Sequence, residues 1–211
     1  MASRSGSGRS SLASSPAINR HQPVFVVTGP SGAGKGTLIS LLLPRFSVVR
    51  AAVSATTRPQ RAGERNGVDY WFLSNEEFAR RVEQDGFLEW VWYVGNRYGT
   101  LLSEIERIRE EGAAPLLELE TQGALEVGRK VPGAVTIFVT APVQELERRL
   151  RERATESSGV IEERIELARR QLAQAHEFDY EIENDDRERA AERLAEIVER
   201  ELDRAATMSG R

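Results

Sequence analysis

Short apolar runs and longer amphipathic segments alternate along most of this chain. The first run, Val24–Thr28, is β-branched and has no polar alternation, which predicts a strand buried on both faces. Similar strands are expected at residues 48–53, 115–120, 135–139 and 180–183. The helices are expected at residues 37–43, 103–111, 123–130, 144–153, 160–175 and 188–205. This alternation predicts an α/β fold in which helices flank both faces of a parallel sheet.

Residues 54–100 break this alternation. They are rich in aromatic residues and short strands, and they contain all 3 tryptophans of the chain. We therefore predict an insertion with a small core of its own. The elements expected in it are a polar, arginine-bearing loop at 54–67, strands at 69–73 and 88–94, and a helix at 75–84.

The chain is expected to form one domain behind an N-terminal tail. Residues 1–21 are rich in Ser, Gly and Arg and lack apolar spacing, so they are predicted to be disordered. The domain should span residues 22–206. Its core is expected at 22–53 and 101–206, on either side of the insertion.

Composition narrows the possible function classes. The 211 residues include no cysteine, which excludes a disulfide framework and a thiolate metal site. The formal net charge of −4 argues against a broad basic surface for nucleic acid. No apolar run approaches the ~20 residues that span a bilayer, and the first residues lack the apolar stretch of a secretory signal. We expect a cytoplasmic protein with neither nucleic acid nor membrane as partner.

The segment between the first strand and the first helix reads G-x-x-x-x-G-K. Glycines let successive backbone N–H groups turn inward around a phosphate, and the following helix directs its positive end at the same anion. Lys35 adds a positive charge toward the outer phosphates. This context predicts a site for a nucleoside triphosphate. Its residues are Gly29, Pro30, Ser31, Gly32, Ala33, Gly34, Lys35, Gly36 and Thr37.

One position of this loop departs from the usual pattern. The residue after the lysine is normally Ser or Thr, whose hydroxyl binds Mg²⁺ directly. Here it is Gly36, and the hydroxyl comes one residue later at Thr37. We expect Mg²⁺ with the triphosphate, held through Thr37 or through water.

The insertion carries candidate groups for a phosphate acceptor. Arg58 and Arg61 are three residues apart in the polar loop and can grip one phosphate from two sides. Glu89 lies between apolar residues. An ionised carboxylate can accept from guanine N1–H and N2–H₂ together, whereas adenine would leave it unpaired. A solvated basic loop and a water-facing carboxylate at a strand edge are the simpler alternatives.

Several blocks together resemble the guanylate kinase family. They are GPSGAGKGT, SATTRPQRAGE, DY, FLEW, GNRYGT, ETQGA and NDD, and the likeness runs from about Pro23 to Glu199. The resemblance implies Mg²⁺-dependent transfer of the γ-phosphoryl group of ATP to GMP or dGMP. It also implies a parallel-sheet core, a GMP-binding insertion and a mobile lid at about 149–164.

The resemblance also implies roles for individual residues. It puts the GMP phosphate on Arg58, Arg61, Tyr70 and Tyr98, and the guanine on Ser54, Glu89 and Thr100. The family's Asp-x-Asp is here Glu118-Leu-Glu120. Glu120 is expected near guanine or the magnesium waters. For Glu118, a site role and an ion pair with a neighbouring arginine stay open.

In this family the lid carries arginines that clamp the ATP phosphates. The matching residues here are Arg149, Arg153 and Arg164. Glu152-Arg153-Ala154 replaces the family's Gly-Arg-Gly, which removes backbone freedom from the lid hinge. Surface arginines in i,i+4 pairs are the simpler alternative for Arg149 and Arg164. Asn184 matches a residue near adenine, and a turn-capping Asn is its alternative.

Catalysis is expected to come from alignment and electrostatics, because the attacking group is already a phosphate oxygen. Lys35, Arg58, Arg153 and Arg164 are the expected catalytic residues. Two other functions stay open. One is an inactive guanylate-kinase-like binding module, against which Lys35 and the intact glycines argue. The other is a kinase for another monophosphate, against which Glu89 and Thr100 argue. The sequence does not separate a monomer from a homo-oligomer.

Overall fold

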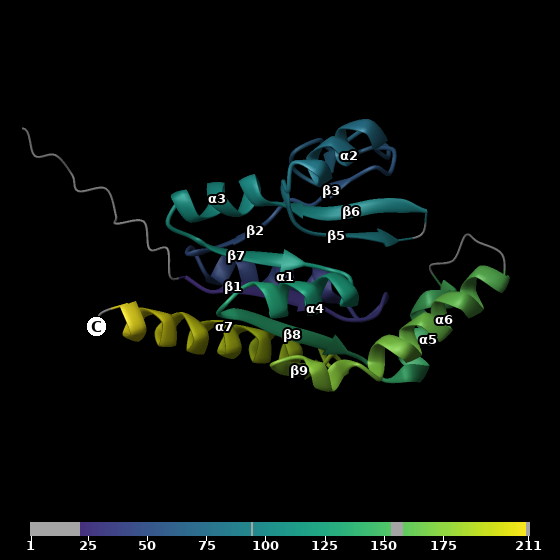
Figure 1. Cartoon of the computed structure of the whole chain (residues 1–211). Helices are drawn as coiled ribbons and strands as arrows, with labels where there is room; N and C mark the ends of the chain where they lie inside the picture. The colour runs from purple at the N-terminus through teal and green to yellow at the C-terminus, as the bar shows by residue number, and fades with distance from the viewer. Residues whose placement is uncertain (1–21, 94, 153–157, 210–211) are drawn as a thin grey trace, which may run out of the picture.

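The computed structural model describes residues 22–93, 95–152 and 158–209, with no side-chain description for residues 158–160 and 209. The predicted tail and Arg153 lie outside these ranges. Two sheets organise the described chain, and Figure 1 shows the smaller one above the larger one.

The larger sheet is fully parallel, with strand order β2-β7-β1-β8-β9. Its central strand, β1, is buried along its whole length, as its uninterrupted apolar sequence predicts. The strands are β1 (Val24–Thr28), β2 (Val49–Ala51), β7 (Ala114–Glu118), β8 (Ala134–Thr140) and β9 (Tyr180–Glu183).

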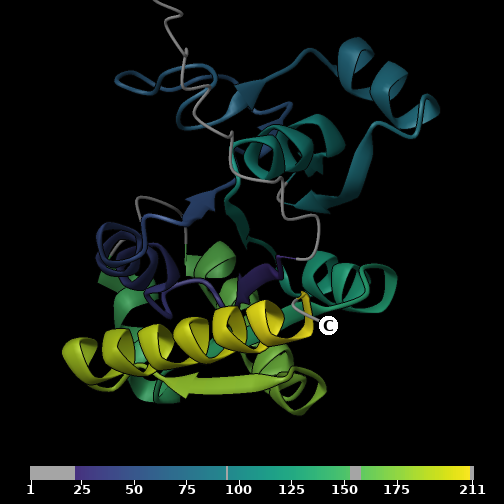
Figure 2. The same cartoon turned by 90° about the vertical axis from the view of Figure 1, so that its left-hand side faces the viewer.

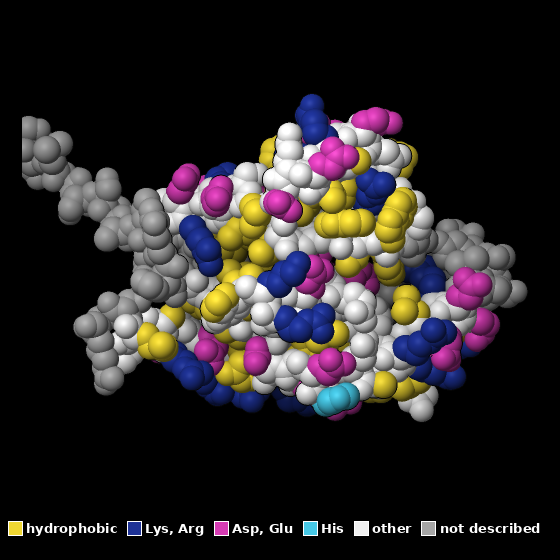
Figure 3. Space-filling model, in the orientation of Figure 1, with side chains coloured by type: hydrophobic (Ala, Val, Ile, Leu, Met, Phe, Trp, Pro, Cys, Tyr) yellow, Lys and Arg dark blue, Asp and Glu magenta, His cyan; other side chains and the backbone are white. Residues whose placement is uncertain are grey.

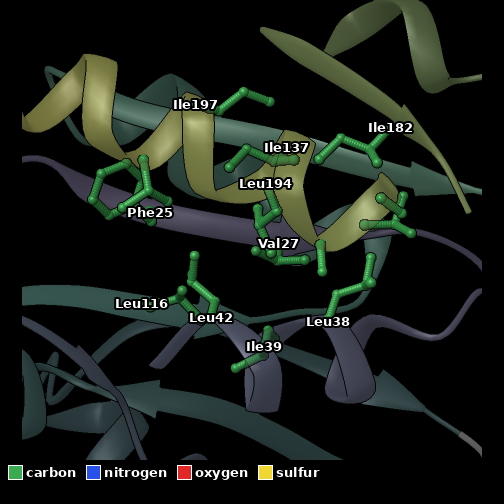
Figure 4. Close-up of a cluster of buried hydrophobic side chains, with 14 of the residues drawn as sticks. Phe25, Val27, Leu38, Ile39, Leu42, Leu116, Ile137, Ile182, Leu194 and Ile197 are labelled. Atoms are coloured by element: carbon green, nitrogen blue, oxygen red, sulfur yellow. The ribbon is translucent and has the colours of Figure 1, made fainter. Parts of the chain in front are cut away.

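Helices cover both faces of this sheet. Phe25 and Val27 point to one face and pack with side chains of α1 and α7 (Figure 4). Val24 and Val26 point to the other face and pack against α3 and α4. The helices are α1 (Lys35–Leu42), α3 (Leu102–Glu110), α4 (Thr121–Lys130), α5 (Val143–Glu152), α6 (Ser158–Leu172) and α7 (Arg187–Ser209), with 3-10 turns η1 (Leu43–Arg45) and η2 (Ala175–Glu177). The predicted α/β class with a flanked parallel sheet is confirmed.

The smaller sheet has the order β4-β3-β6-β5 and is mostly antiparallel. Ala55, Phe78 and Leu101 form its separate buried cluster. The view in Figure 2 also shows this sheet and α2 standing apart from the core. The elements are β3 (Ala55–Thr56), β4 (Trp71–Phe72), α2 (Asn75–Glu83), β5 (Phe87–Tyr93) and β6 (Asn96–Leu101).

The structure corrects several predicted elements. The polar loop at 54–67 contains β3, and residues 96–101 form β6, although their polar sequence does not suggest a strand. Pairing between these two strands buries Thr56, whose hydroxyl donates to the Arg97 carbonyl. The strand expected to reach residue 120 ends at Glu118, because Glu120 caps α4. α6 ends at Leu172 rather than at residue 175.

No helix within the described ranges is both long enough and apolar enough to cross a membrane.

Candidate active site

A cavity of about 800 Å³ lies between the two sheets. The loop after β1 forms one side of it, and strands β5 and β6 of the smaller sheet form the other. The predicted site residues that line it are Ser31, Gly32, Gly34, Lys35, Gly36, Thr37, Ser54, Tyr70, Glu89, Tyr98, Glu120 and Arg164.

The loop after β1 has glycines where its backbone takes positive φ angles. Gly29 has φ +136°, and a Cβ there would lie 2.1 Å from the carbonyl oxygen of Val139. Gly34, with φ +91°, is the N-cap of α1. The loop therefore delivers its backbone amides and the positive end of α1 to the cavity.

The side chain of Lys35 is held in place by hydrogen bonds to this loop. Its Nζ donates to the carbonyl oxygens of Gly29 at 2.7 Å and Pro30 at 3.2 Å. Burial lowers the pKa of this ammonium, while the carboxylates of Glu118 and Glu120 act to raise it. The side chain is oriented before any phosphate arrives.

Three polar side chains from later in the chain contact the loop. Asn184 is buried, and its Nδ2 donates to the Ala33 carbonyl at 2.7 Å. Arg149 donates through Nη1 to the Gly32 carbonyl at 3.0 Å and through Nε to Glu145. Arg164 approaches Ser31 Oγ at 3.4 Å and also lines the cavity. The helices α5 and α6 thus bring two of the three predicted lid arginines to the loop.

Glu89 is the buried carboxylate of the opposite wall. It is 3% exposed, so it does not face water as the simpler alternative required. Thr100 donates its hydroxyl to Glu89 Oε1 at 2.9 Å. Burial raises the pKa of Glu89 to about 7. A Cβ at Gly123 of α4 would lie 2.6 Å from Glu89 Oε2, so the backbone of α4 packs directly against this carboxylate.

The predicted phosphate ligands of the insertion lie only partly in the cavity. Tyr70 and Tyr98 line it, whereas Arg58 and Arg61 do not. Arg58 forms a bidentate pair with Glu64 at 2.7 and 3.1 Å and stacks over the Tyr70 ring. This pair raises the pKa of the guanidinium and lowers that of the carboxyl. An incoming phosphate must therefore bind Arg58 together with Glu64 or displace the Glu64 carboxylate from it.

Glu118 and Glu120 line the cavity beside Lys35 and Thr37. Burial raises the pKa of Glu120, which Lys35 and the nearby amide of Gln171 oppose. Within the described ranges Glu118 pairs with no arginine. Its Oε2 would lie 3.5 Å from a Cβ at Gly36. The lack of a side chain at Gly36 therefore leaves the space next to the Glu118 carboxylate open. These oxygen donors suit Mg²⁺, which keeps several waters and needs few protein ligands.

Several lining residues belong to no motif of the sequence. They include Val91 and Tyr93, which share a face of β5 with Glu89. The alternation of side chains along a strand is the signal that could have found them. Thr100, Asn184 and Arg149 support lining groups without lining the cavity themselves.

A second cavity of about 870 Å³ lies at the opposite, amino end of the core strands, where Pro23, Ala134 and Tyr180 line it. It contains none of the predicted site residues. The chemistry belongs to the cavity between the sheets, since the phosphate loop and the buried carboxylate meet there.

A phosphate-binding loop at the carboxyl ends of a parallel sheet faces a buried carboxylate and tyrosines across one cavity. Such an arrangement defines a P-loop nucleoside monophosphate kinase. The family model described as guanylate kinase matches residues 21–201. This chain therefore belongs to the guanylate kinase family.

Individual relatives agree with this assignment. The guanylate kinase of Rubrobacter xylanophilus is 50% identical over 182 residues, which cover 86% of this chain and 95% of the relative. The guanylate kinase of Desulfitobacterium hafniense is 44% identical over 179 residues, 84% of this chain and 90% of the relative. The crystal structure of guanylate kinase from Anaplasma phagocytophilum matches with a TM-score of 0.68 at 29% identity, covering 86% of each chain.

Proposed function

We propose that this kinase transfers the γ-phosphoryl group of ATP to GMP or dGMP, giving ADP and GDP or dGDP, with Mg²⁺. One observation carries the proposal. The phosphate loop with Lys35 and the buried Glu89–Thr100 pair face each other across one cavity. The loop suits a triphosphate, and the buried carboxylate suits the two adjacent donors of guanine.

ATP occupies the side of the cavity formed by the core. The amides from Gly29 to Thr37 hold its phosphates, and Lys35 offsets their charge. Arg149, Arg164 and Arg153 of the lid clamp the same phosphates, the last lying outside the described residues. Asn184 is the proposed neighbour of adenine, and its buried bond to Ala33 also supports the loop.

GMP occupies the side formed by the insertion. Glu89 and Ser54 hold the guanine, and Thr100 contributes through its hydrogen bond to Glu89. Tyr70, Tyr98, Arg58 and Arg61 hold the phosphate. The rejection of adenine follows from burial, because adenine presents an acceptor at N1 and would leave the second oxygen of the 3% exposed Glu89 carboxylate without a donor.

Mg²⁺ is the proposed metal, with Thr37, Glu118 and Glu120 as the residues that would hold it or its waters. When bound, the metal neutralises part of the charge on the β- and γ-phosphates. Because Gly36 has no side chain, the first hydroxyl after Lys35 is that of Thr37.

In the proposed reaction an oxygen of the GMP phosphate attacks the γ-phosphorus, and the bond to the bridging oxygen of ADP breaks. No residue needs to remove a proton, because the acceptor phosphate is already an anion. Lys35, Arg164, Arg153 and Arg58 stabilise the charge that moves toward the leaving oxygen. Movement of the insertion at about 54–100 and of the lid at about 149–164 would exclude water and so prevent hydrolysis of ATP.

A coupled assay of ADP release with GMP, dGMP, AMP and UMP tests the acceptor. We expect turnover with GMP and dGMP, and turnover lower by several orders of magnitude with AMP. ADP formation with AMP but not with GMP would identify a kinase for another acceptor. We further propose a cytoplasmic location, where both substrates are available.

A further inference from the structure

Strand β5 presents two different faces. Glu89, Val91 and Tyr93 alternate along it, and all three line the cavity. Trp90 and Trp92 point to the other face, where they are 38% and 59% exposed. In the space-filling view, hydrophobic side chains lie exposed over this part of the molecule (Figure 3). Tyr93 thus lies on the substrate side of the strand, although nothing above assigns it a role.

Tyr93 ends a row of aromatic contacts. Its ring meets that of Tyr98 edge-on, with centroids 6.2 Å apart and planes at 75°. Tyr98 in turn meets Tyr70 edge-on at 6.1 Å and 71°. The Arg58 guanidinium lies over the Tyr70 ring, 5.4 Å from its centroid. These are favourable geometries for aromatic pairs and for a cation over a ring.

This row joins two parts of the insertion. Tyr93 and Tyr98 come from the neighbouring strands β5 and β6, and Tyr70 and Arg58 come from the connection between β3 and β4. Tyr98 occupies the middle and is contacted by a ring on both sides. A half-buried phenol needs such contacts to hold one orientation, because an unsupported ring is free to change rotamer.

We infer that Tyr93 is a positioning residue for the acceptor phosphate. Its ring holds the Tyr98 phenol in the orientation that meets the GMP phosphate. This inference rests on the proposed role of Tyr98 in GMP binding. It assigns the function to the ring of Tyr93 and not to its hydroxyl.

The test compares Tyr93→Leu with Tyr93→Phe, using steady-state kinetics and the fluorescence of the insertion's tryptophans during GMP titration. Loss of one aromatic pair should raise the KM for GMP by about two- to tenfold. The KM for ATP and the kcat at saturating GMP should stay within twofold of the parent values. Tyr93→Phe should restore the parent KM for GMP, since it keeps the ring.

Trp92→Leu is the matched control, because it removes a ring from the exposed face of the same strand. Its KM for GMP should not change. The decisive measurement is a double-mutant cycle with Tyr98→Leu, in which Tyr93→Leu should have no further effect on KM. Thermal unfolding of each variant confirms that it is folded.

The outcomes distinguish a failure of the inference about Tyr93 from a failure of the proposed role of Tyr98. If Tyr98→Leu raises the KM but Tyr93→Leu does not, the inference about Tyr93 is wrong and the proposed function stands. An effect of Tyr93→Leu that persists at full size without Tyr98, or a Tyr93→Phe variant as impaired as Tyr93→Leu, also overturns it. If Tyr98→Leu has no effect, the assignment of Tyr98 and the inference resting on it both fail.

Discussion

At the scale of single residues, Lys35 shows how a charge is prepared for phosphate. Two carbonyl oxygens of its own loop hold the ammonium, and Glu118 and Glu120 help to keep it protonated against the cost of burial. A group oriented in this way stabilises a transition state without reorganising during the reaction.

Lys35→Ala should therefore lower kcat by at least ~100-fold, as judged by ADP release with saturating ATP and GMP. Lys130→Ala is the control, because that exposed lysine pairs with Glu126 on the surface of α4. Near-normal turnover of Lys35→Ala would remove the lysine from the catalytic machinery.

Glu89 makes a prediction about pH. Its pKa is raised to about 7, so GMP recognition through an ionised carboxylate should weaken as the pH falls below about 7. The KM for GMP, measured from pH 5.5 to 8.5, should rise as the pH falls below about 7, because Glu89 then becomes protonated. GMP itself titrates near pH 6, as phosphate monoesters do, so a control is needed.

Glu89→Gln supplies that control. It should raise the KM for GMP at neutral pH, narrow the preference over AMP, and lose the inflection near pH 7 while keeping that of the phosphate. A parent enzyme whose KM profile matches that of Glu89→Gln would contradict the role of Glu89. In the ligand-free protein the sign for stability is the reverse. A raised carboxyl pKa means that the free energy of unfolding falls as the pH rises from 4.5 to about 7.

At the scale of elements, the first turn of α4 decides how closely the core approaches Glu89 of the smaller sheet. Gly123 is buried in this helix, and a Cβ there would lie 2.6 Å from Glu89 Oε2. The bulge of β5 between Phe87 and Glu89 and the pairing of Glu89 with Thr100 set the other side of the contact. The glycine therefore serves the contact between α4 and the smaller sheet and not the helix itself.

The variant Gly123→Ala separates an effect on the stability of α4 from an effect on the position of Glu89. Alanine favours a helix over glycine by about 1 kcal/mol, so α4 itself should not be weakened. The added methyl group must displace the Glu89 carboxylate, and the KM for GMP should rise by about tenfold or more, whereas that for ATP should not. Gln122→Ala, at an exposed position of the same helix turn, should leave both KM values unchanged. An unchanged KM for GMP in Gly123→Ala would show that the pocket adapts.

At the scale of the whole molecule, the two proposed nucleotide sites are built on different sheets. The donor loop belongs to the parallel sheet, and the Glu89 pocket belongs to the smaller sheet. They share one cavity, yet the proposed metal groups Thr37, Glu118 and Glu120 all come from the core. Metal dependence and GMP binding should therefore be separable.

Removal of Mg²⁺ with EDTA should abolish phosphoryl transfer and leave GMP binding intact. The binding is measured by fluorescence of Trp71, Trp90 and Trp92, which all lie in the insertion. Readdition of Mg²⁺ should restore turnover, which controls for damage by the chelator. Loss of GMP binding on chelation would place the metal in the acceptor site instead.

The sequence by itself determined the features that depend on neighbouring residues. The G-x-x-x-x-G-K loop needs only the glycines between β1 and α1 and the lysine that follows, so Lys35 and its loop were predictable. The buried strands of the core were predictable for the same reason, since a β-branched run such as Val24–Thr28 carries its own signal.

Only the tertiary structure decided the features that depend on what covers a residue. Polar sequence concealed β3 and β6, because their burial comes from pairing with each other. The raised pKa of Glu89, the ion pair of Arg58 with Glu64 and the contact of Tyr93 with Tyr98 depend on how the folded chain directs these side chains. Burial and side-chain contacts of this kind are set by the folded arrangement, and the order of residues along the chain does not encode them separately.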